Sequence, residues 1–110
     1  MIDQWHKEHV DNAKFSLLIP SWNNLPFLKL CVDSIHKNSV YAHQVIIHVN
    51  EGNDGTLDWV KENSFSYTYS AKNIGVCWSM NAMRKLVDTE YMVFINDDMY
   101  VCPGWDEHTY

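Results

Sequence analysis

Short apolar runs that end abruptly in polar residues restrict the fold of this chain more than any other feature. Three such runs cover residues 15–19, 44–49 and 91–95, and the segment 66–70 alternates between small polar and aromatic residues. Runs of this length, rich in β-branched and aromatic residues and bounded by turn residues, are typical of strands. We therefore predict four strands, the first of which is closed by Pro20.

Segments with helical periodicity lie between the predicted strands. Each has apolar residues three or four positions apart, which places them on one helical face. The three faces are Leu28, Cys31, Val32 and Ile35; Leu57 and Val60; and Val76, Met80, Met83 and Val87. Pro26 suits the first turn of the first helix, and Asp54 is a candidate cap for the second. Strands that alternate with helices predict an α/β fold, with a mostly parallel sheet and helices on both faces.

The polar clusters that follow three of the strands predict where a ligand binds. They are Ser21-Trp22-Asn23, Asn50-Glu51-Gly52 and Asn96-Asp97-Asp98. Ligands of open α/β sheets bind beyond the carboxyl ends of the strands, at a switch in strand order. We therefore expect the three clusters to converge on one rim of the sheet.

Individual residues of these clusters have both a functional and a structural interpretation. The adjacent carboxylates of Asp97 and Asp98 can hold a hard cation, or they can belong to a solvated turn. Trp22 can stack on a nucleobase or pack into the core. Glu51 can accept a hydrogen bond from a base or a ribose, or it can be a surface charge. The segment Asn73-Ile74-Gly75 precedes a helix, so its backbone N–H groups can approach phosphate.

The charge balance narrows the range of partners. Eight basic and fourteen acidic residues give a net charge of −6, and the sequence contains no run of Lys or Arg. A nucleic-acid backbone is therefore not an expected partner. A phosphorylated ligand would favour a divalent cation in the site, because the basic side chains are poorly placed to neutralise it.

The cysteines and the hydropathy pattern bear on the compartment. Cys31, Cys77 and Cys102 form no Cys-x-x-Cys pair, which argues against a zinc ribbon or a redox pair. Reduced, mostly buried thiols are typical of cytoplasmic proteins. No apolar run approaches the roughly 20 residues that cross a bilayer, and the N-terminal stretch lacks a signal-peptide pattern. We expect a cytoplasmic protein without a transmembrane segment.

Several short motifs resemble the N-terminal half of a family 2 glycosyltransferase with the GT-A fold. They lie at residues 18–23, 49–56, 73–81, 94–98 and 103–105. Their order and spacing are similar to those of the family, from Phe15 to about Trp105. The resemblance implies a Rossmann-like GT-A domain that binds a nucleoside-diphosphate sugar and transfers the sugar to an unknown acceptor.

The resemblance also implies roles for single positions. Pro20 and Trp22 match the loop that holds the nucleoside, and Glu51 matches the acidic residue that reads the base. Asn73 belongs to a further matching motif and is assigned to the nucleotide sugar. No catalytic residue is assigned, because the general base of inverting members lies in the acceptor-binding half, which is expected beyond residue 110.

Residues 96–98 match the Asp-x-Asp metal element of the family. The resemblance therefore implies that Asp98 binds Mg²⁺ or Mn²⁺ and that Asp97 lies near the ribose or the sugar. The cation would bridge the diphosphate and act as a Lewis acid that stabilises the leaving nucleoside diphosphate.

The sequence departs from the family pattern at three places. The acidic pair after the second strand is Asn50-Glu51, with a shorter turn after it, and the first Asp of the metal element is Asn96. Met80 stands where many members have an Arg, and Lys72 or Arg84 would have to supply that charge. These departures affect base preference and diphosphate binding more than they affect the fold.

We predict a single, partial domain over residues 1–110 that begins with a polar N-terminal extension over residues 1–14. Residues 91–95 are expected to form a central strand, yet only residues 99–110 follow it, which suggests a domain truncated after the metal-binding strand. The leading hypothesis is a glycosyltransferase domain that binds the sugar donor. The alternative is a nucleotide-sugar-binding or assembly module without transferase activity. A nucleotidyltransferase is disfavoured, because residues 20–23 stand where that class has a Gly-rich loop with a Lys or Arg.

Overall fold

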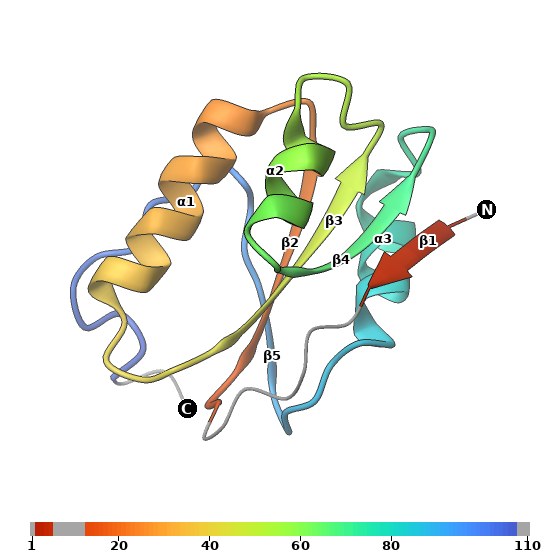
Figure 1. Ribbon diagram of the computed structural model, residues 1–110. Helices are drawn as coiled ribbons and strands as arrows, with labels where there is room; N and C mark the ends of the chain where they lie inside the picture. The colour runs from red at the N-terminus through yellow and green to blue at the C-terminus, as the bar shows by residue number, and fades with distance from the viewer. Residues whose placement is uncertain (1, 6–12, 108–110) are drawn as a thin grey trace.

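The four predicted strands are all present in the computed structural model, which describes residues 2–5 and 13–107 (Figure 1). They are β2 (Ser16–Trp22), β3 (Gln44–Asn50), β4 (Ser66–Ser70) and β5 (Met92–Phe94). A fifth strand, β1 (Ile2–Trp5), lies within the segment predicted as a polar extension and pairs antiparallel with β4. A segment of four residues with two polar positions has too little periodicity to predict this strand.

The strands form one sheet in the order β1-β4-β3-β2-β5. β2 pairs in parallel with β3 and with β5, and β3 pairs in parallel with β4. After β4 the chain crosses back to the far side of β2, so the strand order reverses between β2 and β5. The predicted α/β fold with a mostly parallel sheet is confirmed, and the reversal creates the kind of switch point at which such sheets bind ligands.

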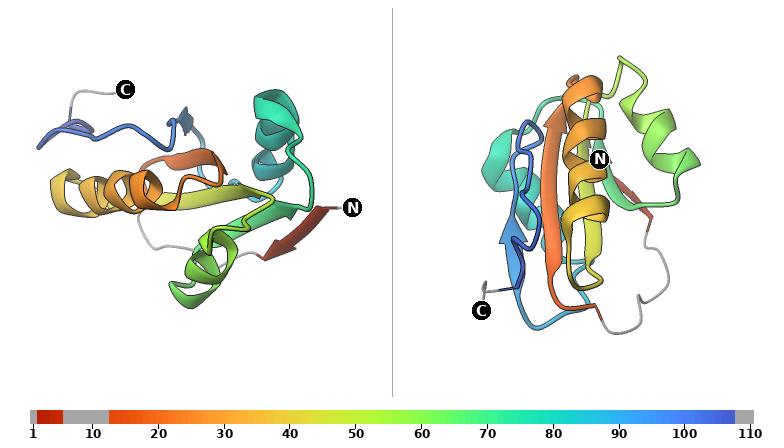
Figure 2. Two further views of the ribbon diagram at one scale, coloured as in Figure 1. Left: turned by 90° about the horizontal axis from the view of Figure 1, so that it is seen from above. Right: turned by 90° about the vertical axis from the view of Figure 1, so that its left-hand side faces the viewer.

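Helices cover both faces of the sheet (Figure 2). They are α1 (Leu25–Asn38), α2 (Thr56–Glu62) and α3 (Gly75–Arg84). Alternate residues of β2 point into two different cores, because successive side chains of a strand face opposite sides. Leu17 packs in the core shared with α1 and α2, whereas Leu18 packs with Ile46 and with Met83 of α3. None of these described helices is both long and apolar enough to cross a membrane.

The apolar faces predicted for α1 and α2 are confirmed. Four residues of α1 are buried in the core that β2 shares with α1 and α2, namely Leu28, Cys31, Val32 and Ile35. Val60 of α2 is also fully buried, and Leu57 packs against the same core. The regular spacing of these residues therefore sufficed to identify the side of each helix that meets the sheet.

The buried face of α3 differs from the prediction at both ends. Val76 is 55% exposed, and Val87 lies beyond the end of the helix. Met83 is buried as expected, but Ser79 is buried beside it. The hydroxyl of Ser79 donates to a backbone carbonyl one turn earlier (2.6 Å), which satisfies the polar group inside the core. A search for apolar spacing alone passes over such a residue.

β2 continues through Pro20 to its end at Trp22, although Pro20 was predicted to close the strand. Alternate residues of a strand direct their backbone polar groups to opposite neighbours. The carbonyl of Leu18 accepts from the N–H of Ile95 (3.0 Å), so Leu18 and Pro20 both face the β5 side. The pairing with β5 ends where Phe94 lies opposite Leu18. Pro20 therefore lacks its N–H group at a place where no strand accepts one.

β5 is an edge strand in this sheet, not the central strand predicted over residues 91–95. Only its three residues pair with β2, and Met92 and Phe94 are 47% and 40% exposed. Within the described residues, no strand lies on the outer side of β5. An apolar run predicts that a strand is present, but it does not show which strands flank it.

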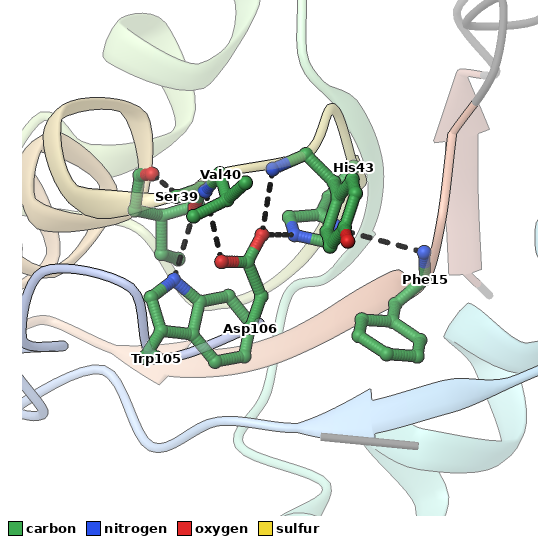
Figure 3. Close-up of polar contacts among 8 residues, drawn as sticks. Phe15, Ser39, Val40, His43, Trp105 and Asp106 are labelled. Atoms are coloured by element: carbon green, nitrogen blue, oxygen red, sulfur yellow. Dashed lines mark hydrogen bonds and ion pairs between the residues drawn. The ribbon is translucent and has the colours of Figure 1, made fainter. Parts of the chain in front are cut away.

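A buried carboxylate fastens the segment after β5 to the residues that follow α1 (Figure 3). Asp106 accepts hydrogen bonds from the backbone N–H groups of Val40 (2.8 Å) and Tyr41 (2.9 Å) and from Nε2 of His43 (2.7 Å). The other imidazole nitrogen, Nδ1 of His43, accepts from the N–H of Phe15 (3.2 Å). Burial by itself would raise the pKa of Asp106, but these hydrogen bonds outweigh burial and lower it. Both nitrogens of His43 are occupied, so the pair stabilises the fold and does not act as a general base.

Candidate functional site

A pocket of about 380 Å³ lies at the carboxyl ends of β2 and β3. Its walls come from these strand ends, from the start of α3 and from the segment after β5. The lining residues are Pro20, Ser21, Trp22, Asn24, Asn50, Asn73, Gly75, Val76, Asn96 and Asp97. The structure therefore brings the three predicted polar clusters to one rim, at the switch in strand order.

The residues assigned to the donor and the metal divide into two groups around this pocket. Four of them line it, namely Pro20, Trp22, Asn73 and Asp97. Glu51 is outside the lining but is bonded to Trp22, and Asp98 is exposed beside the pocket. The lining residues Ser21, Asn24 and Asn50 were not predicted as site residues.

Asp97 is the carboxylate in the wall of the pocket. Oγ of Ser21 donates to its Oδ2 atom (3.0 Å), and the side chain of Asn24 bonds to it as well. The pKa of Asp97 is raised, chiefly by burial and further by the charge of Asp98, although the two hydrogen bonds oppose this rise. Two neighbouring carboxylates, one of them partly buried, are disfavoured unless a cation or further donors compensate their charge.

Cys31 lies beneath the two carboxylates and supports the chain that carries them. Its Sγ donates to the backbone carbonyl of Asn96 (3.7 Å). Burial raises the pKa of Cys31 to about 11, and the charges of Asp97 and Asp98 add to the effect. The thiol is therefore protonated at neutral pH and is not a nucleophile.

The expectation of mostly buried thiols is wrong for the other two cysteines. Cys77 and Cys102 are both exposed, and only Cys31 is buried. Cys77 lies in α3 and Cys102 in the segment after β5. The sequence spacing of cysteines excludes a Cys-x-x-Cys site, but it does not predict the burial of each thiol.

Three hydrogen bonds join the loop after β2 to the loop after β3. They are Trp22 Nε1 to Glu51 Oε2 (2.7 Å), Asn53 N–H to Asn23 Oδ1 (3.0 Å) and Leu25 N–H to Asp54 Oδ2 (2.9 Å). We refer to residues 22–25 and 51–54 with these bonds as the loop staple. Asn23 and Glu51 both have positive φ angles, 45° and 64°, a conformation that is costly for residues other than glycine. The hydrogen bonds of the staple offset this cost and hold the two loops together.

Asp54 was predicted to cap α2, but the structure places Gly55 at the N-cap, with φ 96°. Oδ1 of Asp54 nevertheless accepts from the N–H of Thr56 (3.2 Å), and its Oδ2 accepts from the N–H of Leu25, the first residue of α1. Burial alone would raise the pKa of Asp54, but these hydrogen bonds lower it. One carboxylate therefore stabilises the start of two helices.

Asn50, the last residue of β3, is a buried hydrogen-bonding centre under the pocket. Its Nδ2 atom donates to the carbonyl of Ser21 and to Oγ of Ser79 (both 3.3 Å). Its Oδ1 atom accepts from the N–H of Ile74 (3.0 Å) and from Oγ of Ser70 (3.2 Å). The side chain thus ties the ends of β2 and β4 to the start of α3. The sequence feature that could have identified Asn50 is its position as a polar residue at the end of an otherwise apolar strand.

His48 extends this buried network into the sheet. Its Nδ1 atom is 2.5 Å from Oγ1 of Thr68, and its Nε2 atom is 3.0 Å from Oγ of Ser70. Burial lowers the pKa of His48 to about 4, although a hydrogen bond to Asn50 opposes the change. The imidazole is therefore neutral at pH 7, and its hydrogen bonds connect the side chains of β3 and β4.

We expect the buried His48 to make the fold sensitive to mild acid. In the unfolded chain this imidazole has a pKa near 6.5, so between about pH 6.5 and pH 4 the unfolded state binds a proton that the folded state does not. The contribution of His48 to the free energy of unfolding should then fall by about 3 kcal/mol across this window, and this contribution is complete only above pH 6.5. Urea denaturation at pH 7 and pH 4.5 measures the change.

The matched variant for this measurement is His48→Gln, which cannot titrate. It should lose about 2 kcal/mol less than the natural chain between the same two pH values. An equal loss in both chains would show that His48 is not the titrating group. Asp54 and Asp106 do not interfere, because their lowered pKa values place their effect below pH 3.8.

A larger hollow, of about 580 Å³, lies between α1 and α2, away from the strand ends. Its lining includes the apolar residues Leu30, Trp59 and Phe65 and one carboxylate, Asp33. No residue from the carboxyl end of a parallel strand contributes to it. Because the rim pocket combines the switch point with the paired carboxylates, the smaller pocket is the better candidate site.

A parallel sheet with a polar pocket at its switch point, walled by a carboxylate, defines an α/β domain that binds its ligand at the strand ends. The family described as glycosyl transferase family 2 matches residues 16–110. The chain belongs to this family. The predicted family membership is therefore confirmed, and the match includes every residue assigned to the site.

Solved structures of the TarS protein of S. aureus have the same GT-A fold. The crystal structure of TarS 1–349 is 22% identical, with a TM-score of 0.68, over 81% of this chain and 28% of that chain. The structure of TarS 1–349 in complex with UDP is 20% identical, with a TM-score of 0.72, over 86% of this chain and 30% of that chain. The chain thus spans less than a third of the length of these structures. No curated protein matches the sequence.

Proposed function

We propose that this chain binds a nucleoside-diphosphate sugar in the rim pocket, as the donor-binding part of a glycosyltransferase. The observation that carries the proposal is the pocket at the switch point, with Asp97 in its wall and Asp98 beside it. Membership of glycosyl transferase family 2 supports a sugar donor as the ligand. The UDP complex of the structurally similar TarS supports a nucleoside diphosphate as its leaving part.

Each part of the donor has a counterpart among the residues around the pocket. We assign the nucleoside to Pro20 and Trp22, which line the pocket on the β2 side, and the base to Glu51. Asn73 lines the pocket just before α3 and is assigned to the diphosphate. The positive end of a helix dipole favours an anion at that position.

A divalent cation, Mg²⁺ or Mn²⁺, fits this arrangement if the ligand supplies part of its coordination. Among residues 2–5 and 13–107, no three His, Cys, Asp or Glu side chains gather to form a complete metal site. Mg²⁺ in nucleotide sites is commonly held by one or two carboxylates together with phosphate oxygens and water. We assign Asp98 as the metal ligand and place Asp97 near the ribose or the sugar. A bound cation would neutralise the diphosphate and stabilise it as a leaving group.

We assign no general base within the described residues. His43 and His48 are buried with both ring nitrogens bonded, and Cys31 is held as a thiol. We assign to the residues around the pocket the binding and orientation of the donor, and to none of them the role of the base. A nucleotide-sugar-binding or assembly module without transferase activity is the second candidate, supported by the unavailability of His43, His48 and Cys31 as a base.

Calorimetric titration of the folded chain with UDP, GDP, CDP and ADP tests the proposal. With Mn²⁺ present, at least one of these should bind at least about 10-fold more tightly than it does with EDTA, a difference of about 1.4 kcal/mol. Failure of all four to bind to a chain with intact circular dichroism would contradict it. Release of nucleoside diphosphate that depends on an acceptor would then separate a transferase from a binding module.

A further inference from the structure

We propose that His48 is a positioning residue for the rim pocket, which fixes the turn before α3 through Asn50 and so controls the affinity for the diphosphate. His48 is fully buried and is not among the residues that line the pocket. This inference rests on the proposed function, because it concerns the wall of the pocket to which the diphosphate is assigned. It goes beyond that assignment by naming a residue that acts on the bound nucleotide without touching it.

The first step concerns the turn that leads into α3. Gly75, the first residue of this helix, has a φ angle of 78°, and its N–H donates to Oδ1 of Asn73 (3.0 Å). The preceding N–H, that of Ile74, donates to Oδ1 of Asn50 (3.0 Å) at the end of β3. The turn therefore has one local anchor and one anchor in the sheet. Because Asn73 and Gly75 line the pocket, the anchor in the sheet holds the wall to which the diphosphate is assigned.

The second step concerns the positions of the protons in the network beneath Asn50. Oγ of Ser70 donates towards two carbonyl oxygens, Oδ1 of Asn50 (3.2 Å) and the backbone oxygen of Lys72 (2.7 Å). A hydroxyl has one proton, and carbonyl oxygens only accept. Ser70 therefore has no proton left for Nε2 of His48, which is 3.0 Å from its Oγ. It follows that Nε2 carries the N–H of the imidazole and donates to Ser70.

The third step concerns the other ring nitrogen of His48. Because burial lowers its pKa to about 4, the imidazole is neutral at pH 7 and has a single N–H group. Since Nε2 carries this group, Nδ1 accepts from the hydroxyl of Thr68, 2.5 Å away. Each donor of the network thus points from Thr68 towards Asn50, and all of its side chains are buried. Water does not readily replace a donor that is lost from such a network.

The side chain of His48 consequently determines how firmly Asn50 holds Ile74. With the donor of His48 in place, the proton of Ser70 stays on the carbonyl of Asn50. That oxygen then stays directed at the N–H of Ile74. Loss of the donor lets the hydroxyl and the amide rotate, so the turn before α3 loses its fixed anchor in the sheet. A site that is less ordered before the ligand arrives binds it more weakly, because more ordering must accompany binding.

Two amide variants test the role of His48, because each of them replaces only one of its ring nitrogens. The amide nitrogen of glutamine reaches the position of Nε2, whereas the shorter side chain of asparagine reaches only that of Nδ1. At pH 7 with Mn²⁺, His48→Asn should bind UDP about 10-fold more weakly than the natural chain. His48→Gln should remain within about threefold of the natural affinity. Calorimetry measures both affinities, under conditions in which urea denaturation shows that each variant is folded.

The matched control is Thr68→Val, which removes the hydrogen bond at the other nitrogen of the same imidazole and keeps the branched shape of the side chain. It costs stability, because Nδ1 loses its donor, but it should leave the affinity for UDP unchanged within about twofold. A second readout needs no nucleotide. The amide proton signal of Ile74 in nuclear magnetic resonance spectra should move upfield in His48→Asn and stay in place in His48→Gln and Thr68→Val.

Equal weakening of UDP binding in all three variants would show that His48 is merely structural and would overturn the proposal. Full UDP affinity in His48→Asn, or an unmoved signal of Ile74 in that variant, would overturn it too. The proposed function fails separately if no nucleoside diphosphate binds to the natural chain. The control of affinity would then fail with it, and a shifted Ile74 signal would support only the hydrogen-bond coupling between His48 and α3.

Discussion

Replacement of Asp98 by alanine is expected to weaken Mn²⁺-dependent UDP binding by about 100-fold, or about 2.7 kcal/mol. The physical reason is that the chain offers few ligands to the cation, so the loss of one carboxylate removes much of the protein's share of the coordination sphere. Because Asp98 is exposed, the free energy of unfolding should change by no more than about 0.5 kcal/mol. Calorimetry with Mn²⁺ and with EDTA, together with urea denaturation, measures both quantities.

The control for this experiment is Asp58→Ala, which removes another exposed carboxylate, in α2. It changes the net charge by the same amount and should leave Mn²⁺-dependent binding unchanged within about twofold. In EDTA, the Asp98 variant and the natural chain should bind UDP alike. If Asp98→Ala retained the full effect of Mn²⁺, the assignment of the metal to this carboxylate would be refuted.

Replacement of Asp106 by alanine is expected to lower the free energy of unfolding by about 3 kcal/mol or more. The carboxylate is fully buried and accepts from two backbone N–H groups and from His43. Its removal leaves buried donors without an acceptor, and each such group costs roughly 1–3 kcal/mol. Urea denaturation at pH 7 measures the loss.

Two further variants show whether the hydrogen bonds of Asp106 are responsible for this effect. Asp106→Asn keeps the shape and one acceptor oxygen, so its loss should lie between that of the alanine variant and zero. Asp33→Ala removes an exposed carboxylate of α1 and should change stability by about 0.5 kcal/mol or less. A loss for Asp106→Ala as small as that for Asp33→Ala would mean that the contacts in Figure 3 contribute little.

The fold could be predicted wherever one periodicity dominated a segment. Ile46 and its apolar neighbours in β3 have no alternative to a buried strand, and the spacing of Leu28 and Ile35 admits only one face of α1. The predictions were wrong where pairing with a strand distant in the sequence determines the local structure. β1 is a strand because β4 lies beside it, and Pro20 remains in β2 because β5 ends before reaching it. Such information is absent from a local window of sequence.

The location of the candidate site could be predicted from the sequence, but the hydrogen bonds that support it could not. The carboxyl ends of parallel strands meet at one edge, so Trp22 and Asp97 could be placed on a common rim before their distance was known. The bond between Trp22 and Glu51, and the buried contacts of Asn50, depend on side-chain directions that only the folded chain defines. The assignment of the metal to Asp98 stays a prediction, because the pocket is lined by Asp97 and not by Asp98.

The pairing of β5 with β2 also affects the order in which the molecule acquires its site during folding. Trp22 and Glu51 are 29 positions apart along the chain, whereas Ser21 and Asp97 are 76 positions apart. Closing the longer loop costs more entropy and depends on contacts that form late. We therefore expect the base-binding side to assemble with the first strand pair and the carboxylates to arrive when β5 docks. Recovery of nucleotide binding during refolding would then report completion of the sheet, not its first collapse.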